Sequence, residues 1–387
     1  MSRWSDLGHD LQTGAKSVDI IDRRKTWFLV SAVLVLISIL GLGVRQLDMG
    51  VEFDGGSVFE VKTSDTSVGD VRDIVEGAGV EEPKVQKLGS DRYRIETTSK
   101  STEEARPVQD ALSKELGLPL EEITTQVVGP SWGDDVTSKA LRSLLIFLAL
   151  LTVYLAMAFA PKMAAGAMVA LLHDLVITIG IYALVGFTVS PATVIGLLTI
   201  LGYSLYDTVV VFDKVRENTA DLTKTNKMTY SQAANLAVNQ TLVRSINTTV
   251  IALLPVGGLL FVGAGLLGAG TLKDLALVLF VGMAVGAYSS IFLATPAVVA
   301  LKEREPEMKA LTKRVASREA ALRKSGGKSA TEGGAGGGAG GGVALAAPPE
   351  QDLADEDLNE DGTPRTPGER VQPKRGPSRE QRQKKRP

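Results

Sequence analysis

The sequence predicts a polytopic α-helical membrane protein that carries one exported α+β domain and ends in a polar tail. Hydrophobic residues make up 44% of the 387 residues. They gather in windows of about 20 residues, the length that spans the hydrocarbon core of a bilayer. The mean hydropathy is +0.12 despite long polar segments. The six apolar windows are residues 27–47, 138–160, 163–186, 192–212, 243–266 and 272–300.

The basic residues orient these windows. Arg23, Arg24 and Lys25 precede the first window, which is too long for the apolar region of a cleaved signal peptide and is therefore expected to be an uncleaved signal anchor. Lys and Arg also concentrate between the fourth and fifth windows and after the sixth. The positive-inside rule therefore places these segments and both termini in the cytoplasm. The expected parts are a cytoplasmic segment 1–25, a first span 26–47, an exported domain 48–137, a bundle of the remaining spans 138–302 and a cytoplasmic tail 303–387.

The exported segment has the pattern of a small α+β domain. Alternating strands are expected at 57–62, 84–88, 91–97 and 122–128, and helices at 67–77 and 101–116. The order βαββαβ is that of the ferredoxin-like fold. This segment holds no cluster of His or carboxylates with metal-ligand spacing, so we expect a binding or moving part rather than a catalytic one.

Two glycine-containing junctions connect this domain to the spans. Gly55 and Gly56 permit a turn that other residues make with difficulty. Gly129 and Pro130 mark the exit toward the second span, where a hinge and an ordinary loop before a helix are both open interpretations.

The fourth window carries a carboxylate, Asp207, well inside an apolar stretch. Placing an aspartate charge at membrane depth costs about 3 kcal/mol on insertion scales, and lipid provides no interaction that compensates for this cost. Asp207 is therefore expected to face protein or water and to serve an ion or proton path. The alternative is a structural carboxylate, satisfied by hydroxyls such as that of Ser204 or by a basic neighbour.

The fifth window begins with a polar stripe. Gln240, Arg244, Asn247 and Thr248 recur at spacings of three to four residues and share one helix face. We expect this face to point into the bundle and Arg244 to partner Asp207, so that protonation of the carboxyl and the position of the arginine form a switch. The alternative is that Arg244 extends to the membrane interface.

Three further polar residues are expected to be accessory to the interior. His173 and Asp174 lie in the third window and are expected near its cytoplasmic end. Side chains of adjacent helical residues point about 100° apart, so a mutual ion pair is not expected. Asp213 lies at the charged end of the apolar helix that carries Asp207. The tail after residue 325 is Gly/Ala-rich, then acidic, then basic, a composition that predicts disorder.

Five motifs together carry a family resemblance. They are GVEFDGG at 50–56, VGPSWG at 128–133, ILGYSLYDTVVVFDKVREN at 200–218, NQTLVRSINTT at 239–249 and LKDLALVLFVGMAVGAYSSIF at 272–292. In this order around one exported domain, they resemble the SecF-type members of the SecD/SecF family of the RND superfamily. The family's membrane carboxylate falls on Asp207 and its arginine on Arg244.

The resemblance implies half of an RND-type bundle that is completed by SecD and uses the proton-motive force to promote late steps of protein export. The implied location is the bacterial plasma membrane, with both termini cytoplasmic. The implied partners are SecD, the Sec channel SecYEG, YidC or YajC, an unfolded preprotein and the lipid bilayer, without a specific nucleic acid. No cofactor, metal or enzymatic activity is expected.

Two other classes of function remain to be weighed. The first is a half-size RND exporter of lipids or small molecules. Exporters of this class usually have two six-helix halves and two exported domains in one chain, whereas this sequence has one of each. An intramembrane aspartyl protease, suggested by Tyr206 and Asp207, needs a second intramembrane aspartate that shares a proton with the first. Asp274, at the outer start of the sixth window, is a poor substitute for one.

Overall fold

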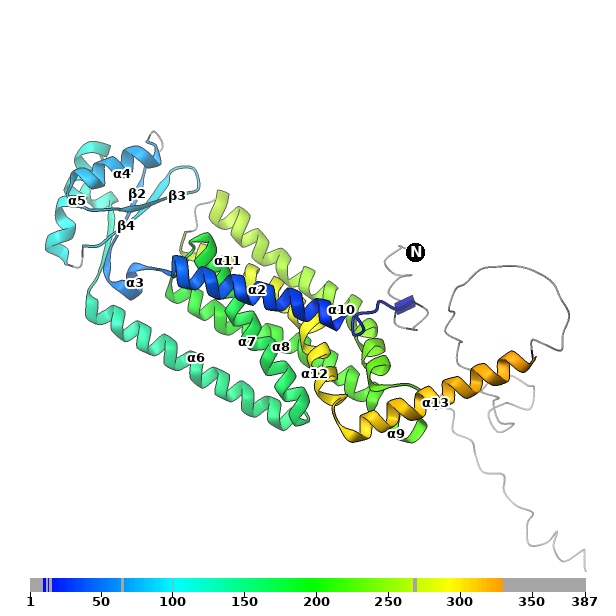
Figure 1. Cartoon of the computed structure of the whole chain (residues 1–387). Coiled ribbons are helices and arrows are strands. Elements are labelled where there is room, and N and C mark those ends of the chain that lie inside the picture. The colour runs from blue at the N-terminus through cyan, green and yellow to red at the C-terminus, as the bar shows by residue number, and fades with distance from the viewer. Residues whose placement is uncertain are drawn as a thin grey trace, which may run out of the picture. The chain divides into compact units, whose positions relative to one another are not determined.

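The computed structural model describes residues 10–11, 13, 16–63, 66–99, 101–266 and 270–329. Within them, six helices are long and apolar enough to cross a membrane, as predicted (Figure 1). The tail that was predicted to be disordered lies almost wholly outside the described residues. The six helices are α2 (Arg24–Arg45), α6 (Pro130–Ala158), α7 (Pro161–Val185), α8 (Pro191–Thr219), α10 (Tyr230–Gly258) and α11 (Gly270–Ser289).

The last span is not a uniform α-helix. After α11 the chain continues through a π-helical segment, η3 (Ser290–Ala294), into α12 (Thr295–Lys302). A second π-helical segment, η2 (Leu259–Leu266), extends α10. On the cytoplasmic side of the predicted topology, α9 (Leu222–Thr225) lies between α8 and α10, and α13 (Pro306–Ser329) follows the last span.

A four-stranded sheet follows the first span. Its strands are β2 (Gly56–Lys62), β3 (Lys84–Leu88), β4 (Arg92–Thr97) and β5 (Thr124–Val128), in the order β3-β4-β2-β5. All neighbouring strands pair antiparallel. Helices α4 (Val68–Gly77) and α5 (Thr102–Leu116) lie in the two places where the sequence predicts helices, and a short 3₁₀ turn, η1 (Leu120–Glu122), precedes β5.

Alternation in the strands and helical spacing in α4 and α5 build the core of this domain. Tyr93 and Ile95 are fully buried on one face of β4 and pack with Val71 and Val75 of α4 and Leu112 of α5. The side-chain hydroxyl of Ser67 caps α4, and that of Ser101 caps α5 by accepting from the Glu104 amide. Each cap satisfies an amide that helix geometry leaves free.

The entry to the domain is a tight, packed turn. Strand β1 (Asp48–Met49) pairs in parallel with β6 (Thr188–Val189) of the α7–α8 connection, and α3 (Val51–Asp54) follows. Gly55 and Gly56 have φ of 78° and 147°, so the predicted need for glycine is confirmed. A Cβ on Gly56 would lie 2.4 Å from the Thr97 carbonyl oxygen.

The exit from the domain leads almost directly from β5 into α6. Gly129 has an ordinary extended backbone, with φ of −75°, and Pro130 occupies the first turn of α6. Proline suits that position because the first amides of a helix have no partner within it. The helix thus begins eight residues before the predicted span. Gly133 lets α6 approach α3 closely, since a Cβ there would lie 2.1 Å from the Phe53 carbonyl oxygen.

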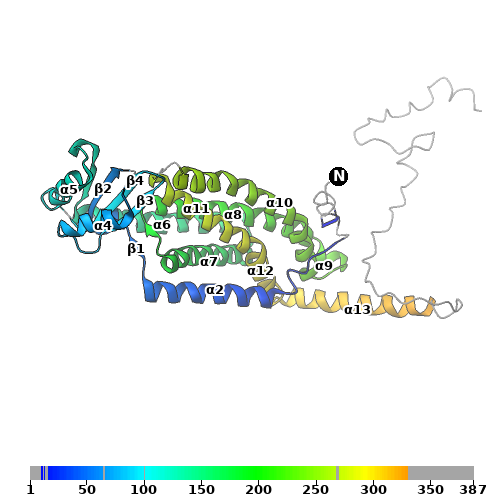
Figure 2. The ribbon, with the colours of Figure 1, turned by 90° about the horizontal axis from the view of Figure 1, so that it is seen from above.

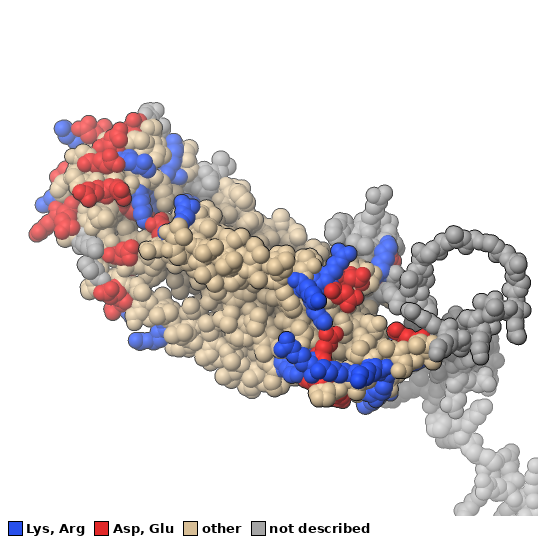
Figure 3. Space-filling model, in the orientation of Figure 1, with Lys and Arg blue, Asp and Glu red and all other residues tan. Residues whose placement is uncertain are grey.

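The bundle depends on small residues where helices cross. Figures 1 and 2 show α2 running alongside α7, and a Cβ on Gly180 of α7 would lie 2.1 Å from Ser38 of α2. On α11, a Cβ on Gly282 would lie 2.0 Å from Ile200 of α8. In Figure 3, charged side chains gather on the α+β domain and at the opposite end of the bundle, and an uncharged band separates them. This distribution fits a bilayer around the band.

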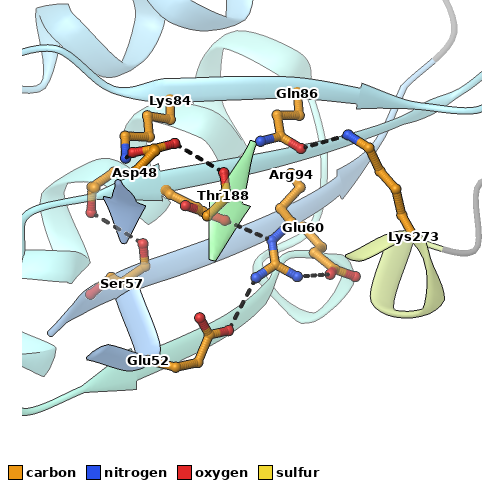
Figure 4. A network of polar contacts seen from close by, with 11 residues as sticks. Asp48, Glu52, Ser57, Glu60, Lys84, Gln86, Arg94, Thr188 and Lys273 are labelled. Carbon is orange, nitrogen blue, oxygen red and sulfur yellow. Dashed lines mark hydrogen bonds and ion pairs between the residues drawn. The ribbon is translucent and has the colours of Figure 1, made fainter. Parts of the chain in front are cut away.

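A half-buried arginine joins the sheet to the entry turn (Figure 4). The Arg94 guanidinium, 16% exposed, lies 3.0 Å from Glu96, 3.3 Å from Glu52 of α3 and 3.9 Å from Glu60 of β2. Burial raises the pKa of Glu96 above its ordinary 4.5, and the nearby Arg94 opposes that rise. At one end of the same network, Lys273 of α11 donates to Gln86 of β3 at 3.3 Å. Three carboxylates therefore depend on a single guanidinium.

We expect Arg94→Met to loosen β4 selectively. Removing one partner from a buried ion pair leaves uncompensated charge and costs about 3 kcal/mol. Hydrogen exchange of the β4 amides, corrected for intrinsic rates, measures that loss. Because the folded-state pKa of Glu96 is raised, protonation favours the folded domain, and the defect should shrink as pH falls through that pKa.

Arg92→Met is the matched control, because Arg92 is exposed on the same strand. Adding Glu96→Gln to Arg94→Met should restore part of the protection. Equal losses for the Arg92 and Arg94 variants, or a defect that grows on acidification, would contradict the role assigned to Arg94.

Candidate functional site

Helix α8 carries the predicted carboxylate into the centre of the bundle. The helix starts with a capping box between Ser190 and Thr193 and with Pro191 in its first turn. Ser204 and Asp207, three residues apart, lie on one face, and both are buried, with exposures of 2% and 6%. The expectation that Asp207 faces protein within the described chain is therefore confirmed.

Two serine hydroxyls hold Asp207. Ser245 Oγ of α10 donates to Asp207 Oδ1 at 2.7 Å, and Ser290 Oγ of η3 donates to Oδ2 at 2.5 Å. Hydrogen bonds from hydroxyls to a carboxylate are short and strong because the acceptor is charged. This arrangement resembles the alternative prediction, a structural carboxylate satisfied by hydroxyls, although the hydroxyls come from residues other than Ser204.

A second carboxylate, Asp174 of α7, has the same kind of environment. Asp174 is 1% exposed and accepts from Ser204 Oγ at 2.6 Å and from Ser289 Oγ at 2.7 Å, both at Oδ2. Its other oxygen, Oδ1, lies 3.1 Å from His173 Nδ1. An ion pair between these neighbours was not expected; they make this contact because side-chain rotation overcomes the angle between adjacent positions, and it is an ion pair only when His173 is protonated. Both residues lie near the middle of α7 and not, as expected, near its cytoplasmic end.

These residues form one polar centre inside the apolar bundle, which we call the serine–carboxylate cluster. Four structural elements contribute to it: α7, α8, α10 and the junction of α11 with η3. Its members are His173, Asp174, Ser204, Asp207, Ser245, Ser289 and Ser290. Among the described residues, no Lys or Arg forms an ion pair with either carboxylate. Hydroxyls can donate to a charged carboxylate or accept from a protonated one. The cluster can therefore accommodate each carboxyl group with or without its proton.

The geometry does not fit hydrolytic chemistry. A Ser-His-Asp triad requires the serine to bond the histidine, whereas the serines here bond the carboxylates and His173 Nε2 has no hydrogen-bond partner in the described chain. Within the described residues no hydrogen bond joins Asp174 to Asp207, as a proton shared in an aspartyl protease would require. The described residues also contain no group of three or more metal-binding side chains.

The structure corrects the expected orientation of the α10 polar stripe. Arg244 and Asn247 are exposed. Thr248 is half-buried, and its hydroxyl donates to the Arg244 carbonyl oxygen at 3.0 Å. The buried face of α10 runs instead through Thr241, Ser245 and Thr249. Arg244 is one residue from Ser245 and therefore points about 100° away from it. The expected contact between Asp207 and Arg244 is absent from the described structure for this reason.

Asp213 also lies outside the cluster. It is exposed at the end of α8 and pairs with Arg216 at 3.1 Å, one helical turn away. Its expected place in the polar interior was wrong, because Asp213 lies six residues after Asp207 on α8, about 1.7 turns further along, and is exposed there.

Sequence reasoning missed three of the four serines. Ser245, Ser289 and Ser290 are each buried to 1% exposure or less. Serines in apolar helices usually indicate close packing, and only the spatial arrangement reveals that they bond carboxylates. The pair Ser289-Ser290 also marks the start of η3; π-helical turns are rare and concentrate at functional sites.

The fold and the cluster define a polytopic membrane protein whose helical bundle encloses a titratable centre. The family model "Protein export membrane protein SecD/SecF, C-terminal" matches residues 108–304. Protein translocase subunit SecF of Streptomyces coelicolor is 53% identical over 321 residues, which cover 83% of this chain and 86% of the relative. The Mycobacterium tuberculosis subunit of the same name is 42% identical over 330 residues, with coverage of 81% and 75%.

A solved structure has the same fold. The crystal structure of SecDF, a translocon-associated membrane protein from Thermus thermophilus, superposes with a TM-score of 0.66 at 28% identity, over 75% of this chain and 39% of that chain. The chain therefore belongs to the SecD/SecF family of protein export membrane proteins.

The glycines on α11 set the position of the cluster, so we expect Gly282→Ala to destabilise the bundle. The added methyl would meet Ile200 of α8 at 2.0 Å; overpacking of this kind costs about 1–3 kcal/mol. Gly202→Ala on α8 is the control, since a Cβ there meets nothing within 4 Å. Thermal unfolding of both variants in detergent measures the difference. A control as unstable as Gly282→Ala would contradict close packing as the cause.

Proposed function

We propose that the chain is an accessory subunit of the protein-export translocase that works with a SecD-type partner and uses the proton-motive force to promote late steps of export. The serine–carboxylate cluster is the observation that carries this proposal. It places two buried carboxylates, held by hydroxyls, in the membrane bundle of a protein-export family member.

The proton-coupling residue of this proposal is Asp207. One charge that crosses 100 mV releases about 2.3 kcal/mol, enough to shift a two-state equilibrium by a factor of about 50. Asp207 contacts α10 and η3 through its two oxygens. Loss of its charge therefore weakens contacts to two helices at once, which is a direct way to move one against the other.

The exported domain is the moving part of the proposal. We assign it a ferredoxin-like fold, which the strand order β3-β4-β2-β5 supports. Helix α11 connects the cluster to this domain, because Ser289 lies at one end and Lys273, bonded to Gln86, at the other. The junctions at Gly55 and Gly56 and at Gly129 and Pro130 are the proposed hinges. An unfolded preprotein would bind and leave the domain as it moves.

A partner would complete the bundle on the exposed face of α10. The SecDF chain includes this fold in about two fifths of its length, which supports a SecD-type subunit for the remainder. Arg244 and Asn247 are exposed on this face beside Ile251 and Leu254. A cation on a spanning helix needs a polar partner, and in this proposal SecD provides it. Contacts with SecYEG, YidC or YajC stay predictions from the resemblance.

The proposed location is the bacterial plasma membrane with both termini in the cytoplasm. Besides the clusters of Lys and Arg in the sequence, ion pairs among α2, α7 and the end of the last span support one common side. Arg24 lies 2.6 Å from Glu303, and Lys162 lies 3.0 Å from Glu305.

Asp207→Asn tests the proposal through preprotein export in cells depleted of the native chain. Asparagine keeps the size and much of the hydrogen bonding but cannot carry a proton, so export should fall at least about tenfold while the variant still co-purifies with SecD. Asp213→Asn is the matched control, because Asp213 is an exposed carboxylate on the same helix. Normal export by Asp207→Asn would contradict proton coupling, and proton-dependent efflux of lipids or small molecules would favour the exporter class instead.

A second experiment tests the partner face. The chain has no cysteine, so Arg244→Cys introduces a single thiol on exposed α10. We expect maleimide labelling to fall about tenfold when SecD is co-expressed, because burial in an interface excludes the reagent. Met157→Cys is the control on α6, where Met157 is 84% exposed. Equal protection at both sites, or none at Arg244→Cys, would remove α10 from the proposed interface.

A further inference from the structure

We propose that Asp174 is a second proton-holding carboxylate of this site, coupled to Asp207 through the adjacent hydroxyls of Ser289 and Ser290. The inference rests on the proposed function, in which Asp207 alone takes the proton. The environment of Asp174 shows why a second carboxylate belongs to the same centre.

The first argument is that Asp174 repeats the chemistry of Asp207. Each carboxylate is buried in a spanning helix and accepts from two serine hydroxyls. A carboxylate used only for packing has no need of such a set, since an apolar residue of similar size would stabilise a bundle equally well. The titratable groups around Asp174 are His173, which contacts it on the same helix, Tyr288 of α11, whose ring stacks on His173 with centroids 6.0 Å apart, and Asp207, which shares a face of α8 with the Ser204 that bonds Asp174. None of them is a fixed cation.

The second argument is that each linking serine has two acceptors within reach. Ser289 Oγ lies 2.7 Å from Asp174 Oδ2 and 3.2 Å from the Gly286 carbonyl oxygen. Ser290 Oγ lies 2.5 Å from Asp207 Oδ2 and 3.2 Å from the Ala287 carbonyl oxygen. When a carboxylate gains a proton, its O–H donates to the serine oxygen, and the serine hydrogen turns to the backbone carbonyl. The site accommodates both protonation states by rotating one hydroxyl at each carboxyl.

The third argument is the shared framework. Ser289 and Ser290 are consecutive, yet one bonds α7 and the other bonds α8, at the point where α11 changes to π-helical geometry. Ser204, which bonds Asp174, lies on the same face of α8 as Asp207. The helices whose serines bond one carboxylate are therefore largely the same helices that bond or carry the other. Ionisable groups that interact strongly release their protons in two steps that belong to the pair and not to either residue alone.

The experiment uses the full chain with its SecD partner in lipid vesicles. Infrared difference spectra between acidic and neutral pH detect the C=O band of protonated carboxyls. We expect Asp174→Asn to remove one component of this band and Asp207→Asn to remove another and displace the first. Ser289→Ala, which leaves both carboxylates in place, should displace the Asp174 component and shift the pH midpoint of export.

Thr178→Val is the matched control, because Thr178 is a fully buried residue of α7 whose hydroxyl has no hydrogen-bond partner in the described chain. It should leave the band and the pH midpoint of export unchanged. A spectrum of Asp174→Asn identical to that of the wild type would overturn the inference, even where Asp207→Asn abolishes export. Normal export by Asp207→Asn would instead overturn the proposed function, while the spectra still decide whether Asp174 takes a proton.

Discussion

Two carboxylates inside an apolar bundle are the constraint on which the rest of the structure depends. Lipid cannot solvate them, so hydrogen-bond donors must come from neighbouring helices. Serine hydroxyls from α8, α10 and η3 meet this requirement. Serine side chains are short, so the helices that carry them must lie close together. The glycines and small residues on α11 and α7 make that approach possible.

Helix α11 links the buried centre to the α+β domain. At one end, Ser289 and the following Ser290 of η3 each bond one of the two carboxylates, and near the other end Lys273 bonds Gln86 of β3. Arg94 ties the same sheet to the entry turn at Glu52. The molecule therefore has polar contacts at both ends of a helix whose middle packs through glycine.

Much of the fold follows from sequence periodicity, and the site follows from it only partly. Apolar windows long enough for a bilayer predicted the spanning helices, and alternation predicted strands such as β4, because burial of Tyr93 and Ile95 imposes a period of two. Asp207 was predicted because charge in an apolar helix is costly. Arg244 was assigned to the wrong face because spacing identifies the residues that share a face but not the direction of that face. Ser245, Ser289 and Ser290 became visible only in three dimensions, where each meets a carboxylate that is distant in sequence.

The central claim is that the protonation state of the cluster sets the position of the exported domain. The most direct measurement is the distance between spin labels on Asp73→Cys in α4 and Val44→Cys in α2, both exposed positions in a chain without native cysteine. The labelled chain is reconstituted with SecD in nanodiscs and measured by pulsed electron resonance at acidic and alkaline pH. The account predicts two distance populations whose ratio changes with pH and becomes fixed in Asp207→Asn. A single distribution that ignores pH, or one that still responds in Asp207→Asn, would contradict it.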